Sequence, residues 1–216
     1  MKIFNFMQLT PFQIFRARVY VPCLNALAYL GDLRRGVSTQ KRIELRELGC
    51  NPNVGARYET ISYKNLKVVL KFAYKKGFDQ FCDIGCGLGR GLLVANEVGF
   101  SGLIGVDISP ILLDNCKKNI LKRGVSAELI CSDIDKFEIP EGKLSIYMFN
   151  PFGEERMTSL VKKLEFRNEE TLIIYFNPKH YECFNQSHKI GEIIWRHFGL
   201  YDEKCYFYLI PPKLRT

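Results

Sequence analysis

Short apolar runs and helix-like patterns alternate along most of the chain. Each run is made mainly of Val, Ile, Leu, Phe and Tyr and ends at a polar or turn residue, which is typical of strands buried on both faces of a sheet. Between the runs, apolar residues recur at the spacing of an amphipathic helix. This alternation predicts a doubly wound, mostly parallel sheet with helices on both faces. The predicted strands are 81–84, 103–106, 128–131, 144–149 and 171–176, and the predicted helices are 89–98, 109–123 and 158–164.

Both ends of the chain add elements to this sheet. Residues 192–197 and 205–210 are predicted to form an antiparallel hairpin at one edge. Residues 63–76 carry apolar side chains at a helical spacing and follow a turn-rich loop. We therefore expect a basic helical extension or lid over 1–55 and a single α/β domain over 56–216.

The N-terminal extension is rich in apolar and aromatic residues between 12 and 30. Arg16, Arg18 and Pro22 interrupt this stretch, and its continuous apolar part is too short to span a bilayer. It also lacks the uninterrupted hydrophobic region of a signal peptide. We favour a helix or helix pair packed on the α/β domain, and a helix lying in a membrane interface is the alternative.

The basic charge of the chain is concentrated in its N-terminal part. The whole sequence has 31 Lys and Arg against 23 Asp and Glu, and residues 1–80 hold 14 of the basic but only 5 of the acidic residues. This asymmetry fits an acidic partner or an anionic membrane surface, and a solvated basic surface explains it equally well. The 8 cysteines include no Cys-x-x-Cys pair. They indicate a reduced, cytoplasmic protein with no metal site. Its basic extension would also allow it to lie at the membrane surface.

A glycine-rich segment, F-C-D-I-G-C-G-L-G-R, closes the first strand and ends at Arg90. Gly85, Gly87 and Gly89 permit a sharp turn and let a ligand lie against the main chain. A dinucleotide site needs a third glycine where this chain has Arg90, and Asp83 would repel a pyrophosphate. S-adenosylmethionine has cationic groups and no phosphate, so an acidic rim suits it. The segment resembles motif I of the class I S-adenosylmethionine-dependent methyltransferases, in particular the small stand-alone bacterial enzymes.

The resemblance covers roughly residues 55–180 and implies a Rossmann-like sheet of seven strands with the cofactor at their carboxyl ends. It implies that Asp107, after the second strand, binds the ribose hydroxyls and that Asp133, after the third, binds the adenine amino group. Ile108 and Ile134 would enclose the adenine ring, with core packing as the alternative. The expected cofactor-binding residues are Asp83, Gly85, Cys86, Gly87, Gly89, Asp107, Ile108, Ser132, Asp133 and Ile134.

The fourth strand ends in F-N-P-F, which resembles the motif that follows this strand in amino-group methyltransferases but is one residue shorter. The side-chain carbonyl of Asn150, or the backbone carbonyls fixed by Pro151, would accept hydrogen bonds from an amine, and Phe152 would contact the acceptor or the sulfonium. The fifth strand ends in a second F-N-P, which would place Asn177 beside Asn150. The remaining expected acceptor-site residues are His180 as a proton acceptor and Tyr58 as a lid contact.

These observations predict an enzyme that transfers a methyl group from S-adenosylmethionine to an amine nitrogen, protein lysine side chains included. Three alternatives stay open: an O-methyltransferase acting on a glycan or lipid-linked sugar, an RNA methyltransferase, and a cofactor-binding subunit without activity. The basic extension is compatible with phosphate contacts, but no recognised RNA-binding module is visible.

Overall fold

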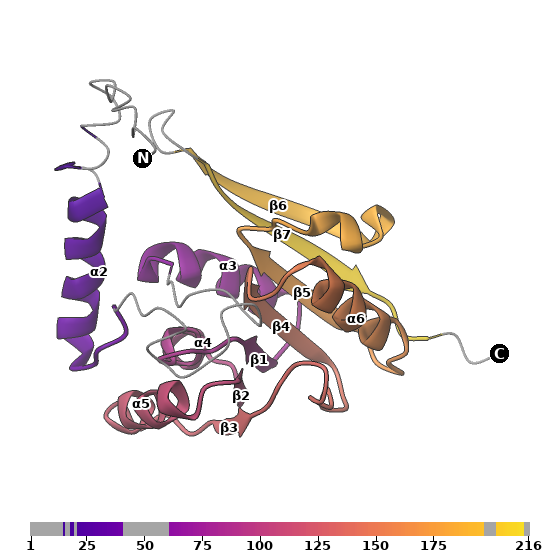
Figure 1. The fold of residues 1–216 in the computed structure, drawn as a ribbon, viewed down its shortest axis with the longest axis horizontal. Helices are drawn as coiled ribbons and strands as arrows, with labels where there is room; N and C mark the ends of the chain where they lie inside the picture. Colours follow the sequence, from indigo (N-terminus) through magenta and orange to yellow (C-terminus); the bar gives the residue numbers. More distant parts are fainter. Residues whose placement is uncertain (1–14, 16–17, 20, 41–60, 197–201, 214–216) are drawn as a thin grey trace, which may run out of the picture.

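The computed structural model describes residue 15 and residues 18–19, 21–40, 61–196 and 202–213. Its centre is a sheet of seven strands in the order β3-β2-β1-β4-β5-β7-β6, in which β7 runs antiparallel to the other six (Figure 1). The predicted architecture is therefore confirmed. The strands are β1 (Gln80–Ile84), β2 (Gly102–Asp107), β3 (Glu128–Cys131), β4 (Leu144–Phe149), β5 (Thr171–Phe176), β6 (Lys189–Arg196) and β7 (Asp202–Ile210).

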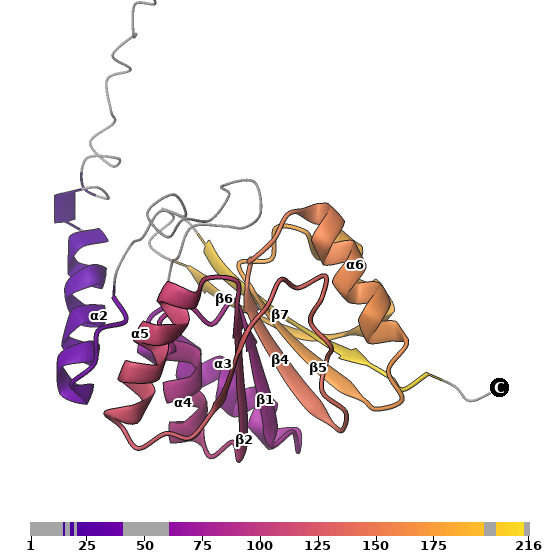
Figure 2. The same cartoon turned by 60° about the horizontal axis from the view of Figure 1, so that its bottom comes forward.

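Helices cover the two faces of the sheet unequally. Three of them pack on one face and one packs on the other (Figures 1 and 2), and each face has its own apolar core. The first group is α3 (Tyr63–Lys75), α4 (Arg90–Val98) and α5 (Pro110–Leu121), and the single helix on the other face is α6 (Glu154–Glu165). Two short 3₁₀ helices, Tyr181–Cys183 and Gln186–His188, lead from β5 into β6.

The helix boundaries follow from local chemistry. Ser109 caps α5, because its hydroxyl accepts a hydrogen bond from the Leu112 amide at 3.3 Å and Pro110 occupies the first turn. Gly99, with a φ of 114°, ends α4 in the left-handed conformation that glycine adopts readily. The structure differs from the prediction at α6, which begins a full turn before Thr158. Two glutamates in its first turn favour that earlier start.

The hairpin at the edge of the sheet is also longer than predicted. β6 begins at Lys189 and β7 at Asp202, and β6 pairs with residues 202–208 of β7, with one irregularity between Lys189 and Gly191. The alternation of apolar and polar residues that predicts a strand is hard to recognise in β6. One face of this strand is half-buried and the other is exposed, so neither face is fully buried.

The N-terminal extension contributes a further helix, α2 (Val21–Arg35), which lies at the outer edge of the molecule (Figure 1). It approaches α3 closely at Gly31, where any side chain would collide with the ring of Tyr63. Arg35 forms two hydrogen bonds with Glu97 of α4, at 2.6 and 2.9 Å. Among the described residues, no helix is both long enough and apolar enough to cross a membrane.

Candidate active site

The glycine loop joins β1 to α4 and is fastened to the end of β2. The amides of Gly85 and Cys86 both donate to the carbonyl of Val106, at 2.8 and 3.0 Å. Gly85, Gly87 and Gly89 all have positive φ angles, of 79°, 52° and 88°. Of the three, only Gly85 is exposed. Gly85 is therefore the glycine of the loop whose main chain is open to a ligand.

The last glycine of the loop has a packing role. A Cβ on Gly89 would lie 2.7 Å from the sulfur of Cys116 in α5, so a larger residue would separate the two helices. Cys86 is buried beside the same sulfur, and its hydrogen bond with Cys116, together with burial, raises the pKa of its thiol. Packing against Cys116 thus accounts for the absence of a side chain at Gly89 and for the buried thiol of Cys86.

Asp107 holds the loop in shape from the end of β2. One carboxylate oxygen accepts from the Gly87 amide and the other from the Ser109 amide, both at 2.9 Å. Burial raises the pKa of Asp107, whereas these amide hydrogen bonds oppose that shift. Each oxygen keeps a second lone pair. Asp107 can therefore accept ribose hydroxyls while it fixes the loop.

Asp83 lies buried at the base of the loop with no hydrogen bond from the described residues. Its carboxylate rests against the backbone of α4 at Gly91, where any Cβ would collide with it. Burial, reinforced by the nearby charge of Asp107, raises the pKa of Asp83 to about 8. Gly91 was not among the predicted residues, although it continues the alternate glycines of the loop and that repeat was visible in the sequence.

The two isoleucines expected to enclose adenine differ in exposure. Ile134 is buried in the core between the sheet and α6, which favours the packing role given as the alternative to an adenine contact. Ile108 is exposed beside Asp107 and remains placed for such a contact. Asp133 is held by Arg156 of α6 through two hydrogen bonds, at 3.0 and 3.1 Å, which the sequence analysis missed. The amide of Ser132 donates to the carbonyl of Asp107 at 3.1 Å.

The two F-N-P segments form matching turns on neighbouring strands. Phe149 and Phe176 are paired in register across β4 and β5, with their rings stacked at 5.3 Å. The asparagines that follow are the only described residues other than glycine with positive φ, at 41° for Asn150 and 50° for Asn177. Asparagine tolerates this conformation better than most residues do. The predicted neighbourhood of the two turns is thus present.

The turn after β4 meets the glycine loop. A Cβ on Gly85 would lie 3.3 Å from the Cβ of Pro151, so the two segments are in close contact. The side-chain oxygen of Asn150 is buried and accepts from the hydroxyl of Tyr175 at 3.2 Å. Burial raises the pKa of Tyr175 to about 12, so this hydroxyl stays protonated and donates. Asn150 is therefore positioned by a partner that the sequence did not reveal.

The other predicted acceptor-site residues are held mainly by the core and by the strands around them. Phe152 is half-buried against the core beneath α6. The amide of Asn177 donates to the carbonyl of Lys204 at 2.8 Å, which extends the pairing of β5 with β7. The amide of His180 donates to the hydroxyl of Tyr175 at 3.2 Å, while its imidazole is half-buried. Tyr58 lies outside the described residues.

Residues 81–165, which contain the glycine loop and the first F-N-P turn, match the family of methyltransferase domains. This match coincides with a strand order and loop geometry that agree with the resemblance seen in the sequence. The chain contains a class I methyltransferase domain. In sequence, the domain is similar to the ribosomal protein L11 methyltransferases of Thermosipho africanus and Thermotoga neapolitana. The identities are 26% and 29%, over 56% and 49% of this chain.

The chain spans less than half of the length of these curated relatives, 46% and 39% respectively. The fold of the methyltransferase domain is shared with solved structures. An RNA methyltransferase from Salinibacter ruber in complex with S-adenosyl-L-homocysteine superposes with a TM-score of 0.54 and 19% identity, over 73% of this chain and 97% of that one. Magnesium protoporphyrin IX methyltransferase from Synechocystis PCC 6803, with bound S-adenosylmethionine, superposes with a TM-score of 0.53 and 14% identity, over 94% and 98%.

A buried polar network ties the N-terminal extension to the methyltransferase domain. We call it the Arg90 network; its members are Asp32, Thr39, Gln40, Tyr63 and Arg90. The Arg90 guanidinium donates to the Thr39 hydroxyl at 2.7 Å and to the Gln40 side chain at 2.9 Å, and lies 3.4 Å from the Asp32 carboxylate. Asp32 also accepts from the amides of Thr39 and Gln40 and from the Tyr63 hydroxyl, at 2.6 to 2.7 Å.

The network explains the residue that replaces the third glycine of a dinucleotide fingerprint. Arg90 is the first residue of α4, and its side chain runs away from the loop toward residues 32–40. A second link lies next to it, because Asn119 of α5 bonds both to the backbone of Ser38 and to the carbonyl of Leu88 in the loop. The extension and the glycine loop therefore share supports. Sequence reasoning missed the network because its members are far apart in the chain.

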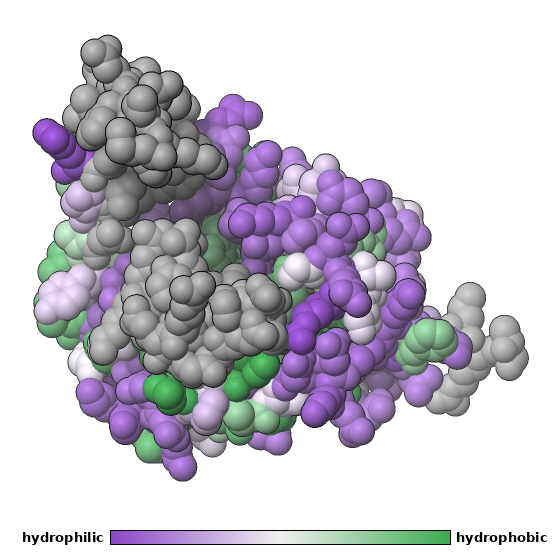
Figure 3. Space-filling view, in the orientation of Figure 1, coloured by the Kyte–Doolittle hydropathy of each residue, from purple (hydrophilic) through white to green (hydrophobic). Residues whose placement is uncertain are grey.

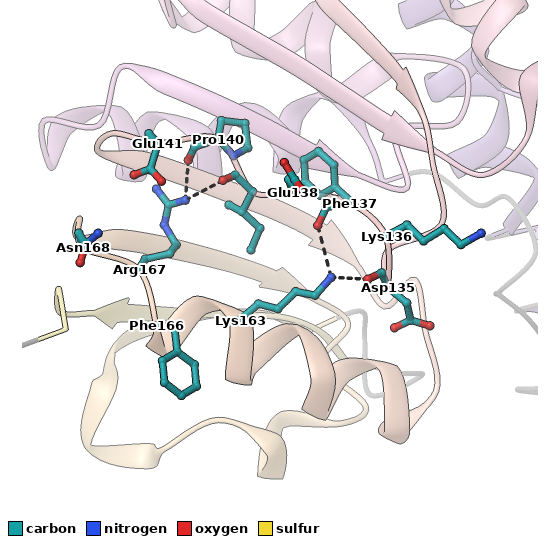
Figure 4. Close-up of a pocket in the computed structure, with 11 residues that line it drawn as sticks. Asp135, Lys136, Phe137, Glu138, Pro140, Glu141, Lys163, Phe166, Arg167 and Asn168 are labelled. Atoms are coloured by element: carbon teal, nitrogen blue, oxygen red, sulfur yellow. Dashed lines mark hydrogen bonds between the residues drawn. The ribbon is translucent and has the colours of Figure 1, made fainter.

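Two further cationic side chains, Lys163 and Arg167, lie away from the glycine loop and line a cavity of about 800 Å³ between α6 and the segment after β3 (Figure 4). Lys163 donates to the carbonyls of Ile134, Asp135 and Phe137, so its ammonium protons are occupied. Arg167 bonds in the same way to the carbonyls of residues 139, 140 and 142. These contacts hold the connection between β3 and β4, and we assign them a structural role.

Proposed function

We propose that the chain is an S-adenosylmethionine-dependent methyltransferase that transfers the methyl group to an amine nitrogen. The observation that carries this proposal is the contact between the glycine loop and the first F-N-P turn, where Pro151 packs against Gly85. At this contact, the loop that resembles a cofactor-binding motif meets the turn that resembles an amine-binding motif, at one point of the sheet edge. In an open α/β sheet, ligands bind at this edge.

The residues at the loop fit S-adenosylmethionine. Gly85 leaves room for a ligand against exposed main chain, and Asp107 retains lone pairs for hydroxyl groups. Asp83 is buried and receives no hydrogen bond from the described residues, and a cationic ligand beside it would lower its raised pKa and favour the charged carboxylate. The negative charge of Asp107 would disfavour a pyrophosphate. The chemistry of the site thus supports the cofactor that the domain family suggests.

The proposed acceptor site uses the chain's own groups for positioning. The bound cofactor supplies an electrophilic methyl group and leaves as a neutral thioether. Asn150 has one lone pair of its side-chain oxygen occupied by Tyr175 and one remaining, which can accept from an amine N–H. Pro151 fixes the backbone that follows. We infer that the turn orients the nitrogen lone pair toward the methyl group, since orientation is the main requirement of such a transfer.

A protein side chain is the acceptor that we favour. The curated relatives are named for a ribosomal protein, which supports lysine or another protein amine as the acceptor class. The likeness to structures named as RNA methyltransferases is below 25% identity and supports the fold only.

Substitution of Asn150 tests the amine proposal. Asn150→Gly keeps the left-handed backbone accessible and removes the amide, whereas Asn150→Ala also strains the backbone by about 1 kcal/mol. We expect both variants to reduce turnover roughly a hundredfold, with the cofactor affinity measured by calorimetry changed less than about twofold. Asn168→Gly, at an exposed asparagine after α6, is the control for a general effect of an asparagine-to-glycine substitution.

The assay follows a labelled methyl group from S-adenosylmethionine into fractionated cell extract. Label in a protein fraction, as an acid-stable methylamine that disappears with Asn150→Gly, supports the proposal. Label in RNA or glycan, or full turnover by the Asn150→Gly protein, overturns the amine assignment. Cofactor binding without transfer to any fraction would favour the subunit without activity.

A further inference from the structure

The helix α2 has its polarity reversed with respect to an ordinary surface helix. Toward the domain it buries Ala28 and the charged side chain of Asp32. Toward the outside it shows three leucines, Leu27, Leu30 and Leu33, which are 64%, 48% and 56% exposed. We call the outward surface the α2 apolar face; it consists of Cys23, Ala26, Leu27, Tyr29, Leu30 and Leu33.

These residues form one continuous surface. At 100° per residue, the outward positions fall on one half of the helix and the buried positions on the other. Hydrophobic side chains gather at the edge of the molecule occupied by α2 (Figure 3). Exposed apolar residues are ordinary when they are scattered, but a patch of large ones on a single helix indicates a surface that meets an apolar partner.

The helix cannot turn to bury this face. Asp32 is held by the Arg90 network, and Arg35 makes two hydrogen bonds to Glu97. The guanidinium of Arg35 also lies 4.0 Å from the centre of the Tyr63 ring, next to the point where Gly31 touches that ring. Rotation of α2 about its axis would break all of these contacts. The outward direction of the leucines is therefore built into the fold.

Among the described residues up to position 40, the exposed charges beside the α2 apolar face are basic, because the single acidic side chain, Asp32, is buried. Arg18 and Arg34 are exposed, at the start and at the end of the helical region. A partner for this face therefore has to offer both an apolar medium and negative charge.

We propose that the α2 apolar face binds the surface of an anionic lipid bilayer, with α2 lying in the interface. A bilayer with acidic headgroups offers the leucines an apolar layer and the arginines negative charge. With 15 residues, α2 is too short to span the hydrocarbon core, which requires about 20 residues. The protein would thus lie on the membrane without crossing it.

A second copy of the chain fits this face less well. In a two-fold symmetric dimer the same patch meets itself, so Arg18 and Arg34 of one copy would face the patch of the other. No exposed acidic side chain in residues 21–40 is present to neutralise them. Like charges opposed across an interface destabilise it.

Vesicle flotation of the full chain tests the proposal. The probes are vesicles of phosphatidylcholine alone and of phosphatidylcholine mixed with phosphatidylglycerol. We expect binding to the mixed vesicles, weakened by added salt, and a loss of roughly tenfold or more in affinity for the Leu27→Glu/Leu30→Glu variant. Leu121→Glu, at a leucine of α5 that is 63% exposed, is the matched control and should bind as the unaltered chain does.

A third variant separates charge from apolar contact. Arg34→Glu should reduce binding to the mixed vesicles at low salt, and the difference from the unaltered chain should shrink as salt is raised. Thermal unfolding checks that each variant is folded. Absence of binding, equal loss with Leu121→Glu, or a dimer in solution that Leu27→Glu/Leu30→Glu dissociates would each overturn the membrane proposal.

Discussion

The neighbouring helices α2 and α3 are attached to the rest of the protein in opposite ways. On α3, Leu66, Val69 and Leu70 face the sheet, while lysines face water. On α2, a carboxylate and a guanidinium face the domain, while leucines face outward. The apolar attachment of α3 is non-directional and tolerant of small shifts. The polar attachment of α2 requires defined geometry and therefore fixes which side of the helix is presented.

The comparison also shows how the extension reaches the active site. The attachment of α3 consists of packing that many residues share, whereas that of α2 runs through Asp32 to Arg90, the first residue of α4 after the glycine loop. A disturbance of α2 is thus expected to be felt at the loop. Substitutions on α2 and α3 separate the two modes of attachment.

The largest effect is expected for Asp32→Ala. The substitution leaves Arg90 and the amides of Thr39 and Gln40 without their buried carboxylate. Removing one partner of such a group costs about 3–5 kcal/mol of unfolding free energy. Urea unfolding measures it, with the exposed Asp114→Ala of α5 as the control. If Asp32→Ala costs no more than the control does, α2 is not attached through the network.

Leu70→Ala should have a similar or slightly smaller cost, for a different reason. Leu70 is fully buried on α3, and its truncation leaves a cavity that costs about 2–5 kcal/mol. Val68→Ala, at a neighbouring exposed position, should cost well below 1 kcal/mol. The same urea titration reports both. Equal costs at positions 68 and 70 would contradict the assigned orientation of α3.

A pH series tests the buried Asp83, which receives no hydrogen bond from the described residues. The pKa of Asp83 is raised to about 8 from an ordinary 3.8, so the native state holds a proton that the unfolded chain releases. The contribution of Asp83 therefore favours the fold below its unfolded pKa and is lost as the pH rises toward about 8. The slope is at most about 1.4 kcal/mol per pH unit.

Asp83→Asn removes this dependence and is compared with the unaltered chain across the same pH range. We expect the variant to gain relative stability as the pH rises, because it has no carboxylate to ionise. Parallel stability curves for the two proteins would show that Asp83 ionises in the native state as readily as in the unfolded chain.

The smallest effect is expected on the outer face of α2. Leu30→Glu should change the unfolding free energy by less than about 0.5 kcal/mol, since an exposed side chain loses little burial. Thermal unfolding in the absence of lipid measures it. A large loss would mean that the leucines of α2 support the fold and would weaken the contrast with α3.

The sequence was most informative where local pattern decides the structure. Short, mainly apolar runs predicted the bounds of β3, β4 and β5, and strand-end position pointed to Asp107 and Asn150. The pattern could not separate Ile108 from Ile134, because both are apolar residues just after a strand. One is exposed and the other is buried under α6, and only the course of the following chain decides this.

Partners that are distant in the chain were beyond prediction. Three side-chain hydrogen bonds join residues from different elements, so no spacing rule marks them: Tyr175 with Asn150, Arg156 with Asp133, and Arg90 with Asp32. Arg90 did stand out as a charged residue in place of a glycine. The physical reason for it, a buried carboxylate on α2, became visible only once the chain was folded.

The most direct test of the account is a calorimetric titration of S-adenosylmethionine into the full chain and into Asp107→Ala, with Asp114→Ala as the control. We predict that the unaltered chain and the control bind alike. Asp107→Ala should bind at least roughly tenfold more weakly while remaining folded, because it loses both a ligand contact and the anchor of Gly87. Equal affinity in all three proteins would contradict a cofactor site at this edge of the sheet.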